Sequence, residues 1–137
     1  MNFNKKLISI VLVLTLFLFG CNRGKTIGVN IHLDESKYYS EAEIMQAVDM
    51  ILDQFEKGFD GCTMMRLIYD EERSNAEAND WAKQYGTEEG IVFYSSFETE
   101  VNAGKGSLES NSTYEGWKWI LTRNSGEKWK LQTCGFG

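Results

Sequence analysis

The sequence contains few of the side chains on which nucleophilic and metal chemistry commonly depend. Its 137 residues include a single histidine, His32, and three cysteines. A Ser-His-Asp or Cys-His arrangement would have to be built on His32, and no family signature of such an arrangement is present. Cys62 and Cys134 lack the spacing of a zinc site. We therefore predict no catalytic residue, no metal site and no cofactor.

Positive charge is also scarce. The chain has 14 Lys and Arg residues against 20 Asp and Glu residues, a formal net charge of −6. Proteins that bind nucleic acids or anionic lipid surfaces do so largely by neutralising phosphates, so this balance disfavours those partners. Residues 102–107 resemble a phosphate-binding loop only superficially, because Gly106 stands where that motif needs Ser or Thr. We predict a surface loop there and no nucleic-acid partner.

The main apolar run lies at the N-terminus. Lys5 and Lys6 precede residues 7–19, which are predominantly apolar. A run of this length spans about 20 Å as a helix, whereas the hydrocarbon core of a bilayer is about 30 Å thick. The run is therefore too short for a stable membrane span. It is typical of a signal peptide, in which the two lysines form the positive region.

Leu18-Phe19-Gly20-Cys21 ends this run and matches a lipoprotein signal, in which a small residue precedes a cysteine that receives the lipid. We predict a signal peptide over residues 1–20, a lipidated tether over 21–28 and a single α+β domain over 29–137. Palmitate and other acyl chains on Cys21 would anchor the domain to the extracytoplasmic face of the cell membrane. The alternative is an ordinary cleaved secretory signal followed by an incidental cysteine.

The segment that would follow cleavage is acidic and of single-domain size. Starting at Cys21 it has 117 residues, and the loss of Lys5 and Lys6 leaves 12 basic against 20 acidic residues, a net charge of −8. We expect such a domain to stand off the bilayer. Residues 22–28 contain two glycines and little apolar content, which indicates a short flexible tether.

Hydrophobic patterns predict both helices and strands. A capping box of Ser40 and Glu43 begins a long helix that ends at Gly58, and a second box of Ser74 and Glu77 begins a shorter helix. Residues 101–113 are rich in Gly, Ser and Asn and are predicted to form a loop. Strands are predicted over residues 29–33, 62–69, 91–97, 114–123 and 128–134.

The order of these elements predicts an α+β fold. We expect a long N-terminal helix packed on a curved antiparallel sheet of about four strands, cystatin-like or NTF2-like. The stretches FEKGFDGC at 55–62, YDE at 69–71, WKWILTR at 117–123, WKL at 129–131 and GFG at 135–137 resemble an uncharacterised family of short lipoproteins from Gram-positive bacteria. The resemblance covers most of residues 28–137. It implies the outer face of a single plasma membrane and implies no activity, since the family has no assigned function.

Two cysteines remain once lipidation consumes Cys21. Cys62 begins one predicted strand and Cys134 ends the last, so a disulfide between them would close a loop of about 70 residues. On the chain-entropy model such a bond would stabilise the fold by about 4 kcal/mol. The alternative is a pair of buried free thiols that act as small apolar side chains.

Aromatic and acidic residues supply a candidate ligand pocket. The tryptophans could line a pocket for a small apolar ligand or a sugar, or could belong to the core. Carboxylates at 70–72 could hold Ca²⁺ or act as general acid and base, or could favour the positive end of a following helix. The candidate pocket residues are Tyr69, Asp70, Trp81, Trp117 and Trp119.

Three functional hypotheses follow. The first is a nonenzymatic, membrane-anchored domain that binds an unknown extracytoplasmic protein or small ligand, with an exposed apolar patch that could include the loop near Gly104 and Gly106. The second is a small NTF2-like hydrolase or isomerase, which needs a concave pocket with inward-facing polar groups such as Asp70, Glu71 or Arg66. A role in envelope stress or immunity, with another secreted protein as partner, is a third.

Lipidation can be tested by metabolic labelling with a fatty-acid analogue. We expect the wild-type chain to take up label and Cys21→Ala to take up none, because the thiol of Cys21 is the predicted acceptor. Label that survives Cys21→Ala would contradict the lipoprotein interpretation.

Overall fold

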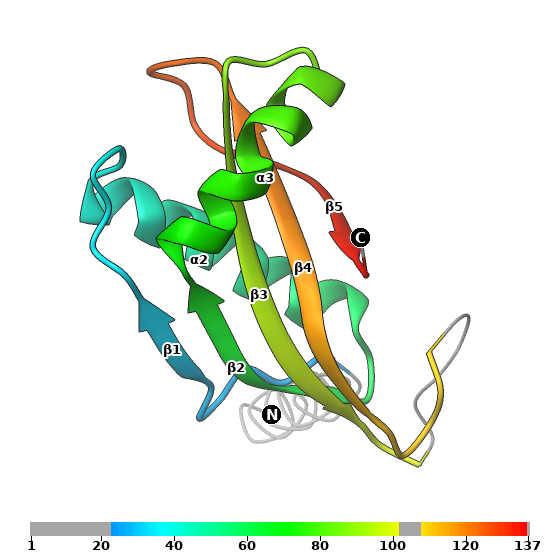
Figure 1. Cartoon of the computed structure of the whole chain (residues 1–137). Coiled ribbons are helices and arrows are strands. Elements are labelled where there is room, and N and C mark those ends of the chain that lie inside the picture. The colour runs from blue at the N-terminus through cyan, green and yellow to red at the C-terminus, as the bar shows by residue number, and fades with distance from the viewer. Residues whose placement is uncertain (1–22, 102–107, 137) are drawn as a thin grey trace, which may run out of the picture.

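The computed structural model describes residues 23–101 and 108–136. In this part of the chain, two helices pack on a mixed sheet of five strands (Figure 1). The sheet has the order β1-β2-β3-β4-β5, in which β1 runs parallel to β2 and all other neighbours are antiparallel. The elements are β1 (Asn30–Leu33), α2 (Glu41–Gly58), β2 (Cys62–Tyr69), α3 (Glu71–Gln84), β3 (Glu89–Thr99), β4 (Thr113–Arg123) and β5 (Lys130–Gly135).

The predicted α+β class is confirmed, but two finer parts of the prediction are wrong. The long helix α2 is not N-terminal, because β1 precedes it. The sheet has five strands in the described residues and is not wholly antiparallel. The reason is the connection: the chain leaves β1, crosses one face of the sheet as α2 and returns beside β1, so β1 and β2 run in the same direction.

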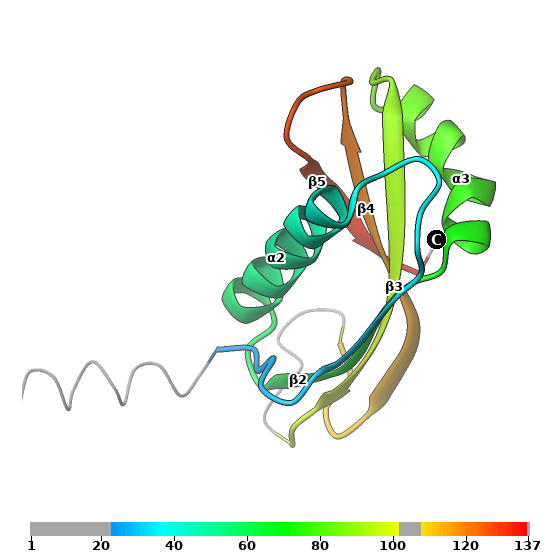
Figure 2. The same cartoon turned by 90° about the vertical axis from the view of Figure 1, so that its left-hand side faces the viewer.

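Helix α2 begins and covers its face of the sheet as the sequence predicts. The hydroxyl of Ser40 accepts the N–H of Glu43, and the Glu43 carboxylate accepts the N–H of Ser40. One stripe of α2 is buried against the sheet, and Figure 2 shows the helix lying along that face. The side chains buried on α2 are Ile44, Ala47, Val48, Ile51 and Phe55.

Helix α3 covers part of the opposite face, and the prediction of its start is wrong (Figure 2). The helix begins at Glu71, capped by the Asp70 carboxylate, which accepts the N–H of Arg73 at 3.2 Å. Ser74 lies inside the helix, where its buried hydroxyl accepts the N–H of Val92 at 2.9 Å. The serine of the predicted capping box therefore makes a hydrogen bond between α3 and β3.

A buried cation joins α2 to the sheet. Arg123 in β4 is 8% exposed and donates to Glu89 at 2.8 Å and also to Glu43. Its guanidinium lies 4.1 Å from the centre of the Trp129 ring and 5.5 Å from that of Tyr39. Burial raises the pKa of Tyr39 to about 12, so its hydroxyl stays protonated.

The predicted flexible tether is wrong for residues 24–26, which are hydrogen-bonded to the domain. The N–H of Gly24 donates to the carbonyl of Glu56 at 3.1 Å. The N–H of Lys25 donates to the carbonyl of Cys62 at 2.8 Å, and the N–H of Met64 donates to the carbonyl of Lys25 at 2.9 Å. Lys25 thus forms a short parallel bridge beside β2. The backbone here is part of the fold.

The ionised carboxylate of Glu43 makes the stability of the fold depend on pH. A backbone hydrogen bond from Ser40 and a side-chain bond from Arg123 lower the pKa of Glu43 from 4.5 to about 2. Because the folded value is the lower one, this stabilisation is present above about pH 4.5 and is lost as the pH falls toward 2. We expect Glu43→Gln to lower the free energy of unfolding at pH 7 by about 2 kcal/mol, since Arg123 keeps Glu89 as its one carboxylate partner, beside the carbonyl of Glu127.

Denaturant unfolding between pH 7 and pH 3 measures this effect. The difference between wild type and Glu43→Gln should shrink as the pH falls below about 4.5. Glu41→Gln is the matched control, because Glu41 is an exposed carboxylate in the same helical turn. An equal loss in both variants would show that the effect comes from the helix terminus and not from Arg123.

Candidate functional site

The predicted pocket residues lie in separate parts of the molecule. Tyr69 and Trp119 are fully buried in the core between α2 and the sheet. Asp70 caps α3, and Trp81 lies on α3 against the other face of the sheet. Trp117 is half-buried on the face that α2 covers. The structure therefore does not assemble these five residues into one pocket.

Trp117 belongs to an aromatic cluster at the C-terminal end of α2. Its ring lies 5.3 Å from Phe97, 6.0 Å from Phe59 and 5.9 Å from Tyr114, measured between ring centres. Phe136, which is 63% exposed, closes the cluster at 5.1 Å from Trp117. The rings fill the space between them through these edge-to-face contacts. The cluster is therefore the part of the core beside the C-terminal end of α2.

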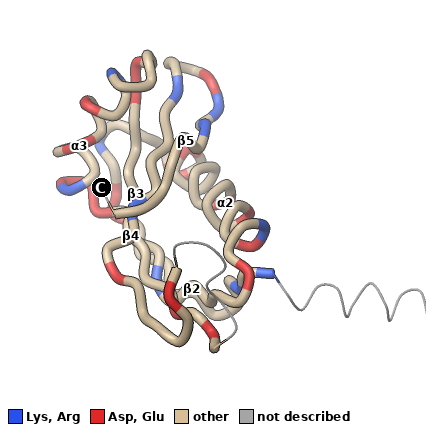
Figure 3. Tube along the Cα trace, turned by 90° about the vertical axis from the view of Figure 1, so that its right-hand side faces the viewer, with Lys and Arg blue, Asp and Glu red and all other residues tan. Residues whose placement is uncertain are grey.

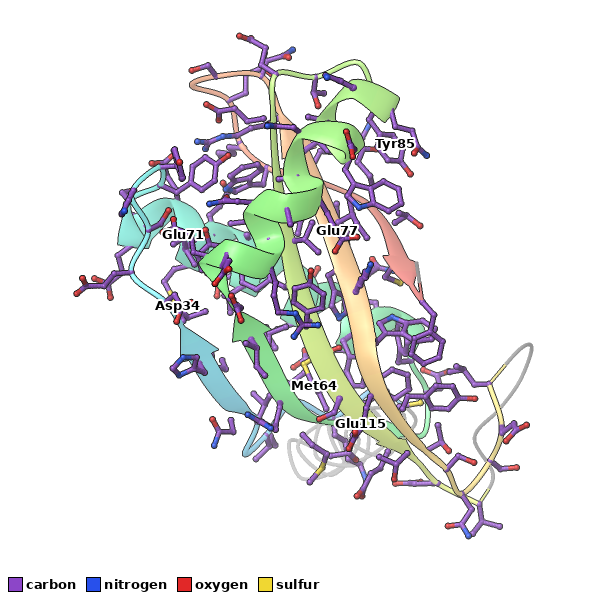
Figure 4. All side chains as sticks on the ribbon, viewed as in Figure 1. Asp34, Met64, Glu71, Glu77, Tyr85 and Glu115 are labelled. Carbon is purple, nitrogen blue, oxygen red and sulfur yellow. The ribbon has the colours of Figure 1, made fainter. Side chains whose placement is uncertain are left out.

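One open depression lies where the loop over residues 34–40 meets the first turn of α3. Its volume is about 430 Å³, and Figure 4 shows Asp34 and Glu71 beside each other there. It is largely open to solvent. Four of its lining residues carry carboxylates and one carries an ammonium group. The lining residues are Asp34, Glu35, Lys37, Tyr38, Glu71, Glu72 and Asn75.

The carboxylates at this depression hold the loop to the helix. Glu71 accepts the hydroxyl of Ser36 at 2.5 Å and the N–H of Lys37 at 3.0 Å. Its own N–H donates to the carboxylate of Asp34 at 3.0 Å. The Ser36 hydroxyl in turn accepts the N–H of Tyr38 at 3.0 Å. Asp34 and Glu71 therefore fix the backbone of the loop.

A second polar cluster joins α3 to the sheet. Glu77 on α3 accepts the hydroxyl of Tyr94 at 2.7 Å and the ammonium of Lys118 at 2.6 Å, and Figure 4 shows it on the side of α3 near β4. Burial opposes ionisation of Glu77, but these hydrogen bonds outweigh it and hold its pKa below the usual value. Arg73 lies 3.8 Å above the centre of the Tyr94 ring. These contacts fasten α3 to β3 and β4.

The residues proposed for catalysis do not converge. Asp70 and Glu71 serve the start of α3, as described above, while Arg66 is exposed on β2. His32 is exposed on the edge strand β1 and contacts Asp34 at 3.3 Å. Within residues 23–101 and 108–136, no group of three or more His, Cys, Asp or Glu residues is placed to hold a metal ion.

Of the two states considered for Cys62 and Cys134, a disulfide or free thiols, the structure has free thiols. Cys62 is buried at the start of β2 and Cys134 is half-buried in β5. Strands β3 and β4 lie between them, and three steps of about 4.8 Å exceed the roughly 7 Å that a disulfide allows between Cα atoms. Burial raises the pKa of both thiols, so neither is activated as a nucleophile.

Sequence reasoning missed the ion pairs that organise these surfaces. Nothing in the local pattern pairs Glu43 with Arg123, which is 80 positions away, or Lys25 with Glu100, which is 75 positions away. The predicted signal peptide, Cys21 and the loop residues Gly104 and Gly106 lie outside the described residues. In the part that is described, no helix is long and apolar enough to cross a membrane.

Three comparisons of the chain with known proteins found no match. No family model matches the chain, and no curated protein and no solved structure matches it. The resemblance to short Gram-positive lipoproteins stays a prediction.

The state of the thiols can be tested by alkylation without reductant. We expect the denatured Cys21→Ser chain to gain two alkyl groups, because Cys62 and Cys134 are both free. Mass spectrometry of the intact chain measures the gain. A chain that takes up alkyl groups only after reduction would contradict the free-thiol state.

Proposed function

We propose that the protein is a lipid-anchored domain on the extracytoplasmic face of the cell membrane that binds a protein or small ligand and is not an enzyme. The observation that carries the location is Leu18-Phe19-Gly20-Cys21 directly after the short apolar run. Two or more acyl chains at Cys21 give firm attachment, whereas one would be marginal. The anchor keeps the domain on the outer side of the membrane, so its partner must be an extracytoplasmic molecule.

The fold that we propose is cystatin-like or NTF2-like. Helix α2 lies across one face of a sheet whose long strands β3 and β4 bend (Figure 2). Register shifts place one extra residue in β2 between Met64 and Arg66, and one extra residue in β4 opposite the Ser95–Phe97 step of β3. Such bulges bend a strand and increase its twist, which supports a sheet that curves around α2.

The packing between α2 and the sheet supports binding over catalysis. An NTF2-like enzyme would use the concave side of the sheet as its pocket, lined by converging polar groups. In the described residues this space is filled by large side chains with no exposed surface. They include Phe55, Phe93, Phe97, Trp119 and Leu121. Recognition then falls to the outer surface of the domain.

The loop over residues 34–40 offers a contact on that outer surface. The ring of Tyr38 is 69% exposed, although its backbone is held by the hydroxyl of Ser36. An exposed tyrosine on a fixed backbone provides contact area at low entropic cost, and tyrosine is enriched in protein interfaces. We therefore assign the partner contact to the surface around Tyr38.

Photo-crosslinking on intact cells tests this assignment. A photoreactive phenylalanine analogue in place of Tyr38 should give a discrete adduct, and the same analogue in place of the exposed Lys83 should give none. Excess soluble Cys21→Ser domain should compete the adduct away, whereas its Tyr38→Ala form should not, because the ring supplies the contact. Equal adducts from both positions, or equal competition by both soluble proteins, would reject the Tyr38 surface.

A further inference from the structure

The chain joins the folded domain very soon after the predicted lipid site. Residues 24–26 pair with the end of α2 and the start of β2 through the backbone bonds described above. The hydroxyl of Thr26 also donates to Glu56 at 2.6 Å, and the ammonium of Lys25 contacts Glu100 at 3.1 Å. Both side chains and backbone therefore hold this segment to one end of the domain.

Gly24 shows how closely the segment is packed. It is buried, and a Cβ atom there would lie 2.2 Å from the carbonyl oxygen of Phe55 and 3.0 Å from that of Phe59. A carbonyl oxygen of a helix end cannot move aside as a flexible side chain can. Only glycine therefore allows the chain to pass this close to the end of α2.

The length of chain between lipid and domain is short. From Cys21 to Gly24 there are three Cα–Cα steps, which span at most about 11 Å. The headgroup region of one leaflet is itself about 5–8 Å thick. The end of the domain that carries Gly24 must then lie at the headgroups, and the domain cannot stand off the bilayer as its net charge suggested.

We propose that the end of the domain formed by residues 24–27 and 98–101 contacts the lipid surface directly, with Ile27 and Val101 as its apolar contacts. The inference rests on the proposed lipid anchor at Cys21. Ile27 is 94% exposed one residue after Thr26, and Val101 is 73% exposed one residue after Glu100. The Lys25–Glu100 ion pair links the two segments, so both apolar side chains are at the anchored end.

The charge of this end selects the kind of lipid surface. Glu98 and Glu100 are exposed here, and the carbonyl of Glu109 binds the hydroxyl of Thr99 beside them. Figure 3 shows acidic residues along this end of β3 and β4. The exposed side chains of Arg23 and Lys25 balance those of Glu98 and Glu100, so this end has no excess positive charge that would attract anionic lipids, and the contact is an apolar one at the interface. We expect it on zwitterionic phosphatidylcholine.

This orientation presents the Tyr38 surface to the outside. Strand β2 begins beside the paired segment at Cys62, and β1 runs parallel to it from Asn30, which lies opposite Arg66. The eight residues of β2 extend about 26 Å, and the loop over residues 34–40 follows the far end of β1 (Figure 1). A domain held down at Gly24 therefore carries Tyr38 at its membrane-distal end.

Spin labels on the lipidated protein in phosphatidylcholine vesicles test the proposal. Ile27→Cys, Val101→Cys and, as the distal control, Tyr38→Cys are each labelled in a Cys134→Ser background, in which buried Cys62 stays unlabelled. We expect labels at 27 and 101 to become several-fold less accessible to an aqueous nickel chelate than on the soluble Cys21→Ser protein, and the label at 38 to remain unchanged. Labels at 27 and 101 that stay as accessible as the label at 38 would overturn the proposal.

A flexible insertion tests whether the paired segment holds this orientation. About ten Gly and Ser residues between Asn22 and Arg23 add roughly 17 Å of average reach. We expect this variant to float with vesicles while its labels at 27 and 101 regain access to the chelate. Labels that stay protected would show that the short connection is not what places the domain.

Vesicle flotation separates this proposal from the proposed anchor. If the wild-type chain made in cells floats and Cys21→Ser does not, the anchor is established, and the label data then decide the contact alone. If both chains fail to float, or both float equally, lipid attachment at Cys21 is wrong and the contact proposal fails with it.

Discussion

Burial of β3 on both of its faces sets the positions of the two helices. Ile91 and Phe93 pack toward α2, while Val92 and Tyr94 pack toward α3 with Ile120 of β4. Burial of each such side chain contributes about 2 kcal/mol to the stability of the fold, and all of them are buried only if both faces of the sheet are covered. The close fit extends to Gly90, where a Cβ atom would lie 2.5 Å from the carbonyl oxygen of Ala78 in α3. A larger residue there would push α3 off the sheet.

The polar residues follow from this arrangement, because most of them fasten helices to the sheet. Arg123 and Glu43 join the start of α2 to β4, and Glu77 and Lys118 join α3 to β4. Glu71 likewise fastens the loop that carries Tyr38 to the start of α3. Charged pairs in such positions give orientation more than net stability, because their attraction has to offset the loss of hydration. The surface that remains for the proposed partner therefore lies on elements that these hydrogen bonds hold to the sheet.

Much of the secondary structure could be read from local pattern, and the failures have a common cause. The capping box at Ser40 is confirmed because Ser40 is exposed and its hydroxyl has only the helix end to bind. The identical pattern at Ser74 failed because Ser74 is buried against β3, where the N–H of Val92 needs an acceptor. The predicted pocket failed for a similar reason: sequence identifies aromatic residues, but the sheet face of each depends on register and bulges, as between Ser95 and Phe97.

The sequence by itself determined the α+β class, the position and capping of α2, the predicted lipid site at Cys21 and the shortage of catalytic and metal-binding side chains. These properties depend on composition and on patterns within a few residues. Only the tertiary structure decided that β1 pairs parallel to β2, that residues 24–26 belong to the fold, and that Arg123 meets Glu43. Such pairings join residues distant in sequence, and they form only because packing on both faces of β3 brings the elements together.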